Sequence, residues 1–343
     1  AGNKSEESFR YTIGNAASGD FREETIYFLI TTRFYDGYSG NNYNCWDEAS
    51  WFKNPVSDPS WRGDFSGLVK KLDYIKALGF SAIWITPPVK NASGIDYHGY
   101  HALDFTEVDP RYDENGDGSA MDEYQNLIDQ CHKKGIKVIQ DIVVNHTGNF
   151  GEENLFPLFE MDSKLGYNGG YKGLDKPANL VANSYLNGIA GGNYAGIVGA
   201  LQYGARINAM KEDANDTKKI YHHEKSMSYE SYTEQIGQMA GDCVDLNTEN
   251  PIVQDYLKKA YDQYINMGVD AFRIDTVKHV SRLDFNKEFI PHWKQTGGNN
   301  FYMFGEVCTR VREVWNKGIA ADSAPFYTWK ESKDYAWGDE ATN

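Results

Sequence analysis

Arg273 and Asp275 stand two residues apart in GVDAFRIDTVKH, residues 268–279. This run is mostly apolar and contains β-branched residues, which is typical of a buried strand. Alternate residues of a strand point to the same face, so the guanidinium of Arg273 should lie beside the carboxylate of Asp275. Charged side chains are rarely buried without a partner, because removing them from water is costly. The pair indicates either a structural ion pair or the floor of an active site.

Glu306 near the end of NFYMFGEV (300–307) would bring a second carboxyl group to the same site. Two carboxyl groups about 5–5.5 Å apart suit a retaining glycosidase, with Asp275 as nucleophile and Glu306 as general acid/base. Arg273 would keep Asp275 ionised. The pocket of Glu306 should be more apolar, so that this residue stays protonated. Taken alone, however, the three residues fit a structural ion pair with a surface Glu better than they fit catalysis.

Alternating strands and helices are predicted to position these residues. Strands are expected at 25–31, 81–86, 136–144, within 268–279 and at 300–307, and helices at 65–79, 121–135 and 250–268. Repeated strand–helix units with apolar strands imply a parallel sheet covered by helices. Five such units alone do not separate a doubly wound sheet from a barrel.

The carboxyl ends of the predicted strands carry most of the chemically capable side chains. In sheets of this kind, functional residues gather at those ends. The residues at or just beyond the ends of strands two to five are His98, Tyr100, Asn145, His146, Arg273, Asp275, Lys278, His279 and Glu306. Their clustering favours a functional site over a chance arrangement.

Composition excludes several classes of function. The formal net charge is -15, from 34 Lys and Arg against 49 Asp and Glu. Such an acidic surface repels phosphate backbones, so no nucleic-acid partner is expected. The apolar stretches are too short and too interrupted for a membrane span. The four cysteines lie far apart without a CxxC pair, which argues against a zinc site or a disulfide scaffold.

Five segments resemble the conserved regions of the α-amylase family, glycoside hydrolase family 13. They are DYHGY (96–100), DIVVNH (141–146), DCVDLNTENP (242–251), FRIDTVKH (272–279) and FGEV (304–307). The resemblance runs from about residue 25 to 310. It implies an α/β fold, a (β/α)8 TIM barrel with a B domain inserted after the third strand.

The expected domain organisation follows from this resemblance and from composition. Residues 1–20 are a polar arm, 21–146 the first part of the barrel, 147–240 the inserted B domain, and 241–343 the continuation of the barrel. Residues 147–240 are rich in Gly, Asn and Tyr and lack the strand–helix rhythm. Because only about five units precede residue 343, we expect the barrel to be incomplete here. A third catalytic Asp, another His and a C-terminal β-domain would lie beyond it. A separate polypeptide segment would then complete the barrel.

The resemblance also implies roles for individual residues. Asp275 would be the nucleophile, Glu306 the general acid/base and Arg273 the support of the nucleophile. His98 and His146 would hydrogen-bond the sugar at the cleaved bond, Tyr100 would stack beneath that sugar, and Lys278 and His279 would contact the leaving-group side.

Three groups of oxygen-bearing residues suggest calcium sites. Asn145, Asp245 and the carbonyl of His279 resemble the family's structural calcium site between the barrel and the B domain. Asp36, Asn41, Asn42 and Asp64 resemble a second site of bacterial members, with Tyr38 in place of a polar ligand. Asp113, Asn115 and Asp117 alternate in DENGDG (113–118) as in the first half of an EF-hand loop. Because Tyr124 stands at the twelfth position, Asp122 would have to close that shell, and a solvated turn is the alternative.

The leading hypothesis is an endo-acting α-amylase that hydrolyses starch, maltooligosaccharides and related α-glucans with retention. The alternatives are a cyclodextrin-forming or other glucan transferase, and a non-catalytic glucan-binding relative. The sequence keeps both Asp275 and Glu306, which disfavours the last. No segment resembles an intact signal peptide, as would hold for a mature secreted protein. We expect a secreted or cell-surface protein.

Overall fold

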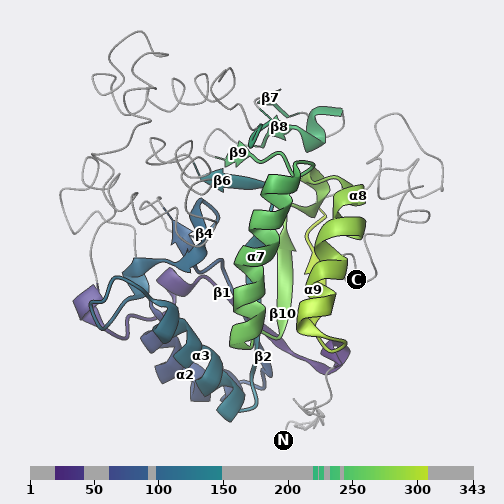
Figure 1. Ribbon diagram of the computed structural model, residues 1–343. Helices are drawn as coiled ribbons and strands as arrows, with labels where there is room; N and C mark the ends of the chain where they lie inside the picture. Colours follow the sequence, from purple (N-terminus) through teal and green to yellow (C-terminus); the bar gives the residue numbers. More distant parts are fainter. Residues whose placement is uncertain are drawn as a thin grey trace, which may run out of the picture.

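The computed structural model describes residues 20–41, 62–91, 98–148, 219–222, 224–227, 232–239 and 243–307 (Figure 1). At its centre lies one sheet of five parallel strands. The strands are β1 (Ile26–Leu29), β2 (Ala82–Ile85), β5 (Lys137–Val143), β10 (Ala271–Asp275) and β11 (Tyr302–Gly305). All five strands predicted from the sequence are confirmed, and each is shorter than its apolar run.

The order of the strands in the sheet distinguishes a barrel from a doubly wound sheet, which the alternation of strands and helices in the sequence could not do. A doubly wound sheet reverses its order at a switch point, whereas a barrel keeps neighbouring strands in chain order. The order here is β1-β2-β5-β10-β11, which is chain order throughout. The sheet therefore corresponds to the first five strands of a (β/α)8 barrel. Within the described part of the chain, β1 and β11 each have a neighbouring strand on one side only.

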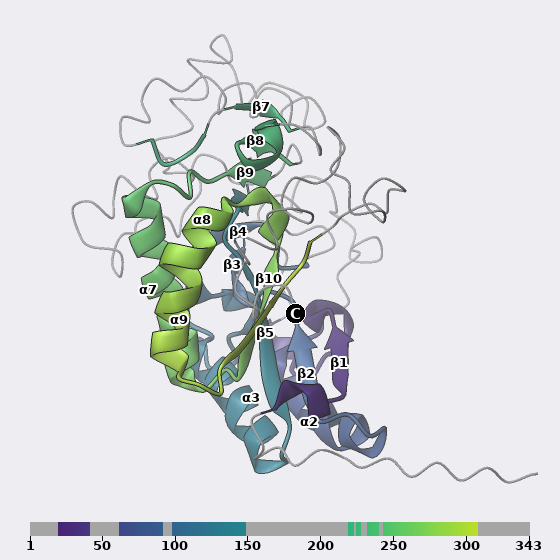
Figure 2. The same cartoon turned by 90° about the vertical axis from the view of Figure 1, so that its right-hand side faces the viewer.

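Helices follow the strands and pack along the sheet (Figures 1 and 2). They are α2 (Phe65–Ala77), α3 (Met121–Lys133), α7 (Pro251–Met267), α8 (Arg282–Asp284), a π-helix (Phe285–Phe289) and α9 (Ile290–Gly297). The two ends of α7 illustrate why these segments are helical. Asn250 caps the first turn, and Pro251 occupies the first helical position, where the backbone N–H would have no partner within the helix. Gly268 ends the helix with a φ of 105°. No helix among the described residues is long and apolar enough to cross a membrane.

Aromatic side chains hold the outer helices against β10. The ring of Phe272 lies 5.8 Å from that of Tyr261 on α7 and 5.6 Å from that of Trp293 on α9, centroid to centroid. All three side chains are fully buried. Burying a side chain such as Phe272 contributes about 1.5–3 kcal/mol, so this cluster fixes the strand that ends in Asp275.

Aromatic residues also line the opposite face of the sheet. Trp84 on β2 packs against Phe28 on β1 and Phe304 on β11, with centroid distances of 4.4 and 5.8 Å. On the edge strand, Ile26 and Phe28 are 38% and 48% exposed. In a closed barrel this face is the interior, where side chains from all strands meet in layers.

Short strands connect the sheet to the predicted insert. An antiparallel pair, β3 (Val89–Asn91) and β4 (Ala102–Val108), follows β2 and was not predicted. β6 (His146–Gly148) pairs antiparallel with β9 (Cys243–Asp245), which joins the two ends of the insert to each other. β7 (Glu224–Ser226) pairs with β8 (Gly237–Gln238). Residues 149–218 lie outside the described residues, so the inserted B domain stays a prediction.

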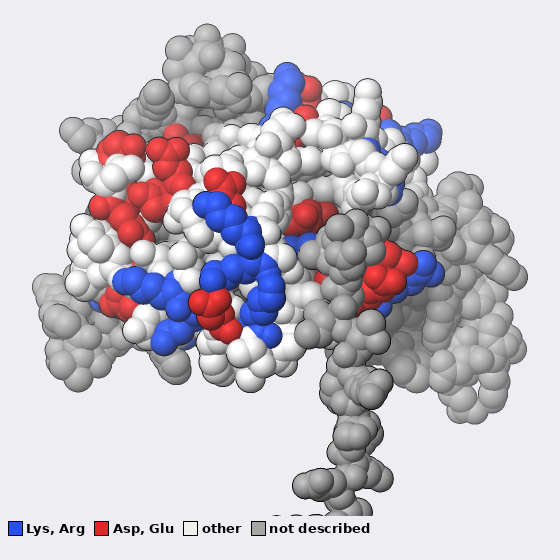
Figure 3. Space-filling view, turned by 90° about the horizontal axis from the view of Figure 1, so that it is seen from below, with Lys and Arg blue, Asp and Glu red and all other residues white. Residues whose placement is uncertain are grey.

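Short 3-10 helices complete the described elements. They are Phe21–Glu23, Thr31–Arg33, Ser39–Asn41, Pro110–Tyr112, η10 (Tyr232–Gln235) and η11 (Val277–His279). On the face seen from below in Figure 3, Lys and Arg side chains lie beside Asp and Glu side chains.

Candidate active site

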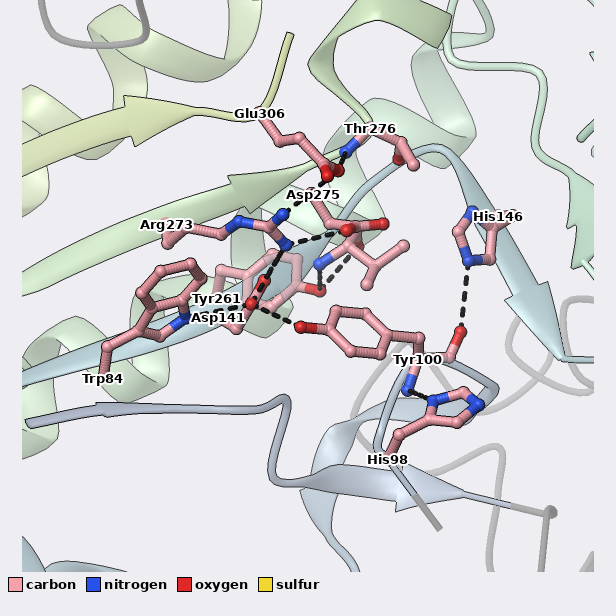
Figure 4. A network of polar contacts seen from close by, with 11 residues as sticks. Trp84, His98, Tyr100, Asp141, His146, Tyr261, Arg273, Asp275, Thr276 and Glu306 are labelled. Carbon is pink, nitrogen blue, oxygen red and sulfur yellow. Dashed lines mark hydrogen bonds and ion pairs between the residues drawn. The ribbon is translucent and has the colours of Figure 1, made fainter. Parts of the chain in front are cut away.

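Three carboxyl groups meet at the guanidinium of Arg273 (Figure 4). Nη1 of Arg273 donates to Asp275 Oδ1 at 2.7 Å and to both oxygens of Asp141 at 2.9 and 3.0 Å. Nη2 lies 3.0 Å from Glu306 Oε2. The two predicted catalytic residues therefore lie close together, because the carboxyl groups of Asp275 and Glu306 both contact the guanidinium of Arg273.

Strand register explains why these residues meet. Arg273 on β10 lies opposite Asp141 on β5, and Ile274 opposite Gly305 on β11. Arg273 and Asp275 share one face because strand side chains alternate. Glu306 directly follows β11, so it reaches the same edge of the sheet. The site therefore lies at the carboxyl ends of neighbouring strands, as predicted.

Asp141 is the functional candidate that sequence reasoning missed. Its side chain is fully buried, and Oδ2 also accepts hydrogen bonds from the Tyr100 hydroxyl at 2.7 Å and from Trp84 Nε1 at 3.0 Å. The available signal was an acidic residue inside the apolar run 136–144, the same signal that singled out Asp275. Asp141 lies at the centre of the network in which Arg273 and Tyr100 take part.

The electrostatics of the cluster favour a bound proton. Burial raises the pKa of Asp275, the charge of Asp141 raises it further, and Arg273 opposes both effects. Burial likewise raises the pKa of Asp141, against the effect of Arg273. Burial alone would lower the pKa of Arg273, but its carboxylate partners raise it. Three carboxylates around one cation leave an excess of negative charge, so burial and mutual repulsion work against Arg273, which was predicted to keep Asp275 ionised.

Thr276 adopts a strained backbone directly after Asp275. Its φ is 51°, in the left-handed region that β-branched residues rarely occupy. This turn ends β10, begins η11, and directs the Thr276 N–H to Glu306 Oε2 at 3.3 Å. Such strain costs on the order of 1–3 kcal/mol and is most often found at functional sites.

The surroundings of Glu306 differ from the sequence-based expectation. An apolar pocket was predicted, but the side chain is 44% exposed and pairs with Arg273. Glu306 directly follows β11, and its carboxylate lies 3.0 Å from Arg273 Nη2 at the carboxyl edge of the sheet. Charge contacts therefore surround Glu306 where apolar groups were expected.

The structure brings three of the predicted sugar-binding residues together. The Tyr100 N–H donates to His98 Nδ1 at 3.1 Å, and their rings lie 5.4 Å apart. His146 is buried, and its Nε2 donates to the Tyr100 carbonyl at 3.1 Å. His146 therefore holds the backbone of Tyr100, and its predicted contact with the sugar stays a prediction.

Lys278 and His279 lie in η11, against the described end of the insert. Both are buried. Lys278 Nζ lies 3.9 Å from Glu234 Oε2, and His279 Nδ1 donates to the Glu234 carbonyl at 3.0 Å. Burial lowers the pKa of His279, which keeps its imidazole neutral. Their predicted contacts with the leaving-group side are not tested by this geometry.

The first predicted calcium site has a geometry that fits a hard cation. One end of the Asn145 amide lies 2.9 Å from the His279 carbonyl oxygen and 3.3 Å from Asp245 Oδ1. With the amide nitrogen at that end, Asn145 donates to both groups. With the amide oxygen there, three oxygens converge as in a calcium site. The three residues predicted to bind calcium are therefore adjacent and chemically suitable.

His222, which was not predicted, also contacts this group. It bonds Asp245 Oδ2 through Nδ1 at 2.5 Å and Glu249 through Nε2 at 2.8 Å. Burial opposes its protonation, but the two carboxylates raise the pKa of His222 to about 9. Burial raises the pKa of Asp245 to about 7. A charged His222 thus links β9 to the loop that precedes α7.

The second predicted calcium site fits less well. The Asp64 carboxylate accepts from the backbone N–H groups of Gly37 at 3.0 Å, Tyr38 at 2.8 Å and Gly67 at 2.6 Å. It therefore caps α2 and fastens a loop. Asp36 and Asn41 lie in the described part of that loop, and Asn42 lies outside the described residues.

The DENGDG loop forms a self-bonded turn. Asp113 accepts from the N–H groups of Asn115, Gly116 and Gly118 at 2.9, 2.7 and 2.8 Å. Asp117 accepts in turn from Ser119 N–H at 2.8 Å. These contacts match the solvated-turn alternative. Nowhere in the described ranges do three His, Cys, Asp or Glu residues form a group that could hold a metal.

Comparison with known proteins agrees with the arrangement of the central sheet. The sequence model of the family described as "Alpha amylase, catalytic domain" matches residues 28–157 and 204–334. The chain belongs to this α-amylase family, which contains glycoside hydrolases and transferases. Its fold is that of the family's (β/α)8 barrels, here with five strands described.

Individual relatives include both hydrolases and transferases. The chain is 33% identical over 306 residues to a beta/alpha-amylase of Paenibacillus polymyxa, covering 86% of this chain and 20% of that protein. It is 30% identical over 279 residues to a cyclomaltodextrin glucanotransferase of Geobacillus stearothermophilus, covering 78% of this chain and 32% of that protein. A solved Anoxybacillus α-amylase is similar with a TM-score of 0.55 and 26% identity, covering 84% of this chain and 48% of that one. The chain thus spans a third or less of these two curated relatives.

Proposed function

We propose that the protein containing this chain is an endo-acting α-amylase that hydrolyses α-1,4-glucosidic bonds of starch, maltooligosaccharides and related α-glucans with retention. The observation that carries the proposal is the convergence of Asp275, Glu306 and Asp141 on Arg273 at the carboxyl ends of parallel strands. Two carboxyl groups with different surroundings can divide the roles of nucleophile and acid/base.

The reaction would proceed in two displacements. In the first, Glu306 gives its proton to the glycosidic oxygen while an Asp275 oxygen bonds to the anomeric carbon, and the leaving sugar departs as an alcohol. In the second, Glu306 takes a proton from water, which attacks the anomeric carbon and releases Asp275. Arg273 would offset part of the burial penalty on the Asp275 carboxylate and keep that carboxylate aimed at the anomeric carbon.

Tyr100 is the proposed platform for the sugar at the cleaved bond. Its hydroxyl is anchored on Asp141, and His146 and His98 fix its backbone. Because these contacts hold both the hydroxyl and the backbone of Tyr100, its ring loses little further freedom when a sugar stacks on it, which lowers the cost of binding. His98 beside it supplies a polar group for a sugar hydroxyl.

We also propose calcium as the resident metal, held by Asn145, Asp245 and the His279 carbonyl. When bound, the ion would supply positive charge that fastens β9 and η11 to the end of β5, without acting in the chemical steps. The proposal rests on the close approach of these oxygen-bearing groups. Calcium at Asp36, Asn41, Asn42 and Asp64, or at Asp113, Asn115 and Asp117, is a weaker proposal, because Asp64 and Asp113 each accept three backbone N–H groups.

A glucan transferase is the second candidate function. The observation favouring it is the similarity to a cyclomaltodextrin glucanotransferase at 30% identity. A transferase would share Asp275 and Glu306 and differ in whether water or a sugar hydroxyl attacks the glycosyl intermediate. A non-catalytic binding role is disfavoured because both carboxyl groups are present and assembled.

The test is to digest starch with the full-length protein and follow the products by NMR and chromatography. Linear oligosaccharides that first appear in the α-configuration would support the amylase proposal. Cyclic products would favour the transferase. First products in the β-configuration, or no glucan conversion at all, would refute the proposed function.

Location follows from the proposed substrate. Starch and other long α-glucans do not cross membranes, so an enzyme that attacks them from outside must be secreted or held at the cell surface. We propose such a location, and activity of the native protein in culture medium or on intact cells would test it. Activity only after cell lysis would contradict it.

A further inference from the structure

Trp84 contacts both partners of the buried ion pair beneath the candidate nucleophile. Its Nε1 donates to Asp141 Oδ2 at 3.0 Å, and its ring lies 5.2 Å from the guanidinium carbon of Arg273 (Figure 4). A cation within about 6 Å of an indole face is attracted by the ring. One side chain thus holds the anion through its edge and the cation through its face.

Neighbouring aromatic rings fix the indole in this position. Phe28 and Phe304 contact it from the strands at the two edges of the described sheet, with centroids at 4.4 and 5.8 Å. Ile83 and Ile85 flank Trp84 on β2 and are fully buried in the main hydrophobic cluster. Alternation along the strand therefore turns Trp84 to the opposite face, where Ala82, Ile139 and Ala271 leave room for a large ring.

We propose that Trp84 is a positioning residue that acts on catalysis through Asp141 and Arg273. Asp141 Oδ2 accepts from Trp84 and Tyr100 as well as from Arg273, so these two donors set the direction of the carboxylate. The position of the Asp141 carboxylate fixes the orientation of the Arg273 guanidinium. The guanidinium in turn orients the carboxyl groups of Asp275 and Glu306. The proposal rests on the proposed glycosidase function and adds a residue that contacts neither reacting carboxyl group directly in the described contacts.

The first experiment compares Trp84→Phe with Trp293→Phe in the full-length protein. Trp293 is a matched control, because its buried Nε1 has no hydrogen-bond partner among the described residues and it packs in the outer core. Both changes should lower the melting temperature. Only Trp84→Phe should lower kcat, by about tenfold or more, because a hydrogen bond to a charged group is lost. The KM for maltooligosaccharides should change little.

A double-mutant cycle then separates positioning from general destabilisation. If Trp84 acts through Asp141, Trp84→Phe should reduce kcat by less than about twofold in an Asp141→Asn background. Equal fold losses in both backgrounds would overturn the proposal, as would equal effects of Trp84→Phe and Trp293→Phe on kcat.

If Trp84→Phe does not fold, 3-benzothienylalanine at position 84 keeps the ring size and removes only the donor. A normal kcat for that variant would also overturn the proposal. Failure of the wild-type protein to convert any glucan would instead refute the proposed function, so the two failures can be told apart.

Discussion

Asp275 and Glu306 have different tasks at one guanidinium, and substitutions should separate those tasks. Asp275→Asn replaces the nucleophilic carboxylate by a neutral amide and should lower kcat on starch by at least about 1,000-fold. Glu306→Gln should impair starch far more than an aryl glycoside with an activated leaving group, which needs little protonation. Steady-state kinetics on both substrates measure this. Near-normal starch hydrolysis by Asp275→Asn would contradict the assignment.

Asp141 should affect kcat, although the contacts described for its side chain are all with other residues of the protein. Asp141→Asn removes one of the carboxylates that hold Arg273 and leaves a neutral amide against it. We expect kcat to fall by about 100-fold, because hydrogen bonds to charged groups are among the strongest polar contacts. Asp255→Asn is the matched control, since Asp255 forms an exposed pair with Lys259 on α7. Equal kinetics of the two variants would rule out a role for Asp141 in the site.

The sequence predicted Asp275, Arg273 and Glu306 because each ends an apolar run or shares the periodicity of one. Asp141 and Trp84 escaped prediction because their importance depends on register. Asp141 becomes a partner of Arg273 only when residues 132 positions apart lie opposite each other on β5 and β10. The spacing of residues within one segment does not reveal such a pairing. The pairing becomes visible only when the register between neighbouring strands is known.

At the scale of elements, β9 and η11 meet where calcium is proposed. Chelation should lower the melting temperature and the activity together, because an ion that binds the folded state alone stabilises that state. Calcium should reverse the loss more fully than magnesium, which demands a smaller and more regular shell. Asp245→Ala should diminish the response more than Asp113→Ala. A melting curve that strong chelator leaves unchanged after dialysis would count against the site.

His222 should make the attachment of β9 depend on pH. Its pKa is raised in the folded protein to about 9, so the stability it contributes is complete below about pH 6.5 and is lost as pH rises through 9. His222→Gln should therefore lower the free energy of unfolding more at pH 8, where His222 is charged and Asp245 is ionised, than at pH 10, where His222 is neutral. Denaturant titrations in chelator at both pH values measure the difference. An equal loss at both values would show that charge is not the cause.

Helices and strands were predicted correctly where a single periodicity of apolar residues extends through the whole segment. All five strands and three long helices were predicted, because apolar runs and capping residues mark them. The β3–β4 pair was missed. β4 carries Asp104, which is fully buried and accepts from Thr106 N–H and from its hydroxyl, both at 2.7 Å. The buried Asp104 breaks the alternation of apolar and polar residues by which a strand is recognised in a sequence.

At the level of the whole molecule, the described sheet has two edge strands, β1 and β11, and the apolar side chains of Ile26 and Phe28 on β1 are exposed. Exposed sheet edges promote association with other strands. Expressed without any further residues, the described part of the chain should therefore be poorly soluble and without amylase activity, and strands supplied on a second segment should restore both. Light scattering and starch hydrolysis test this. A soluble, monomeric and fully active product would show that the described sheet needs no further strands.

The central claim is that Asp275 forms a covalent bond to the sugar. The most direct measurement is mass spectrometry of peptides from the Glu306→Gln variant of the full-length protein after reaction with an α-maltosyl fluoride, whose leaving group needs no acid. We expect a glycosyl adduct on the peptide that contains Asp275, and none when Asp275 is replaced by Asn. Consumption of the fluoride with an adduct on another residue, or with direct formation of a β-configured product and no adduct, would contradict it.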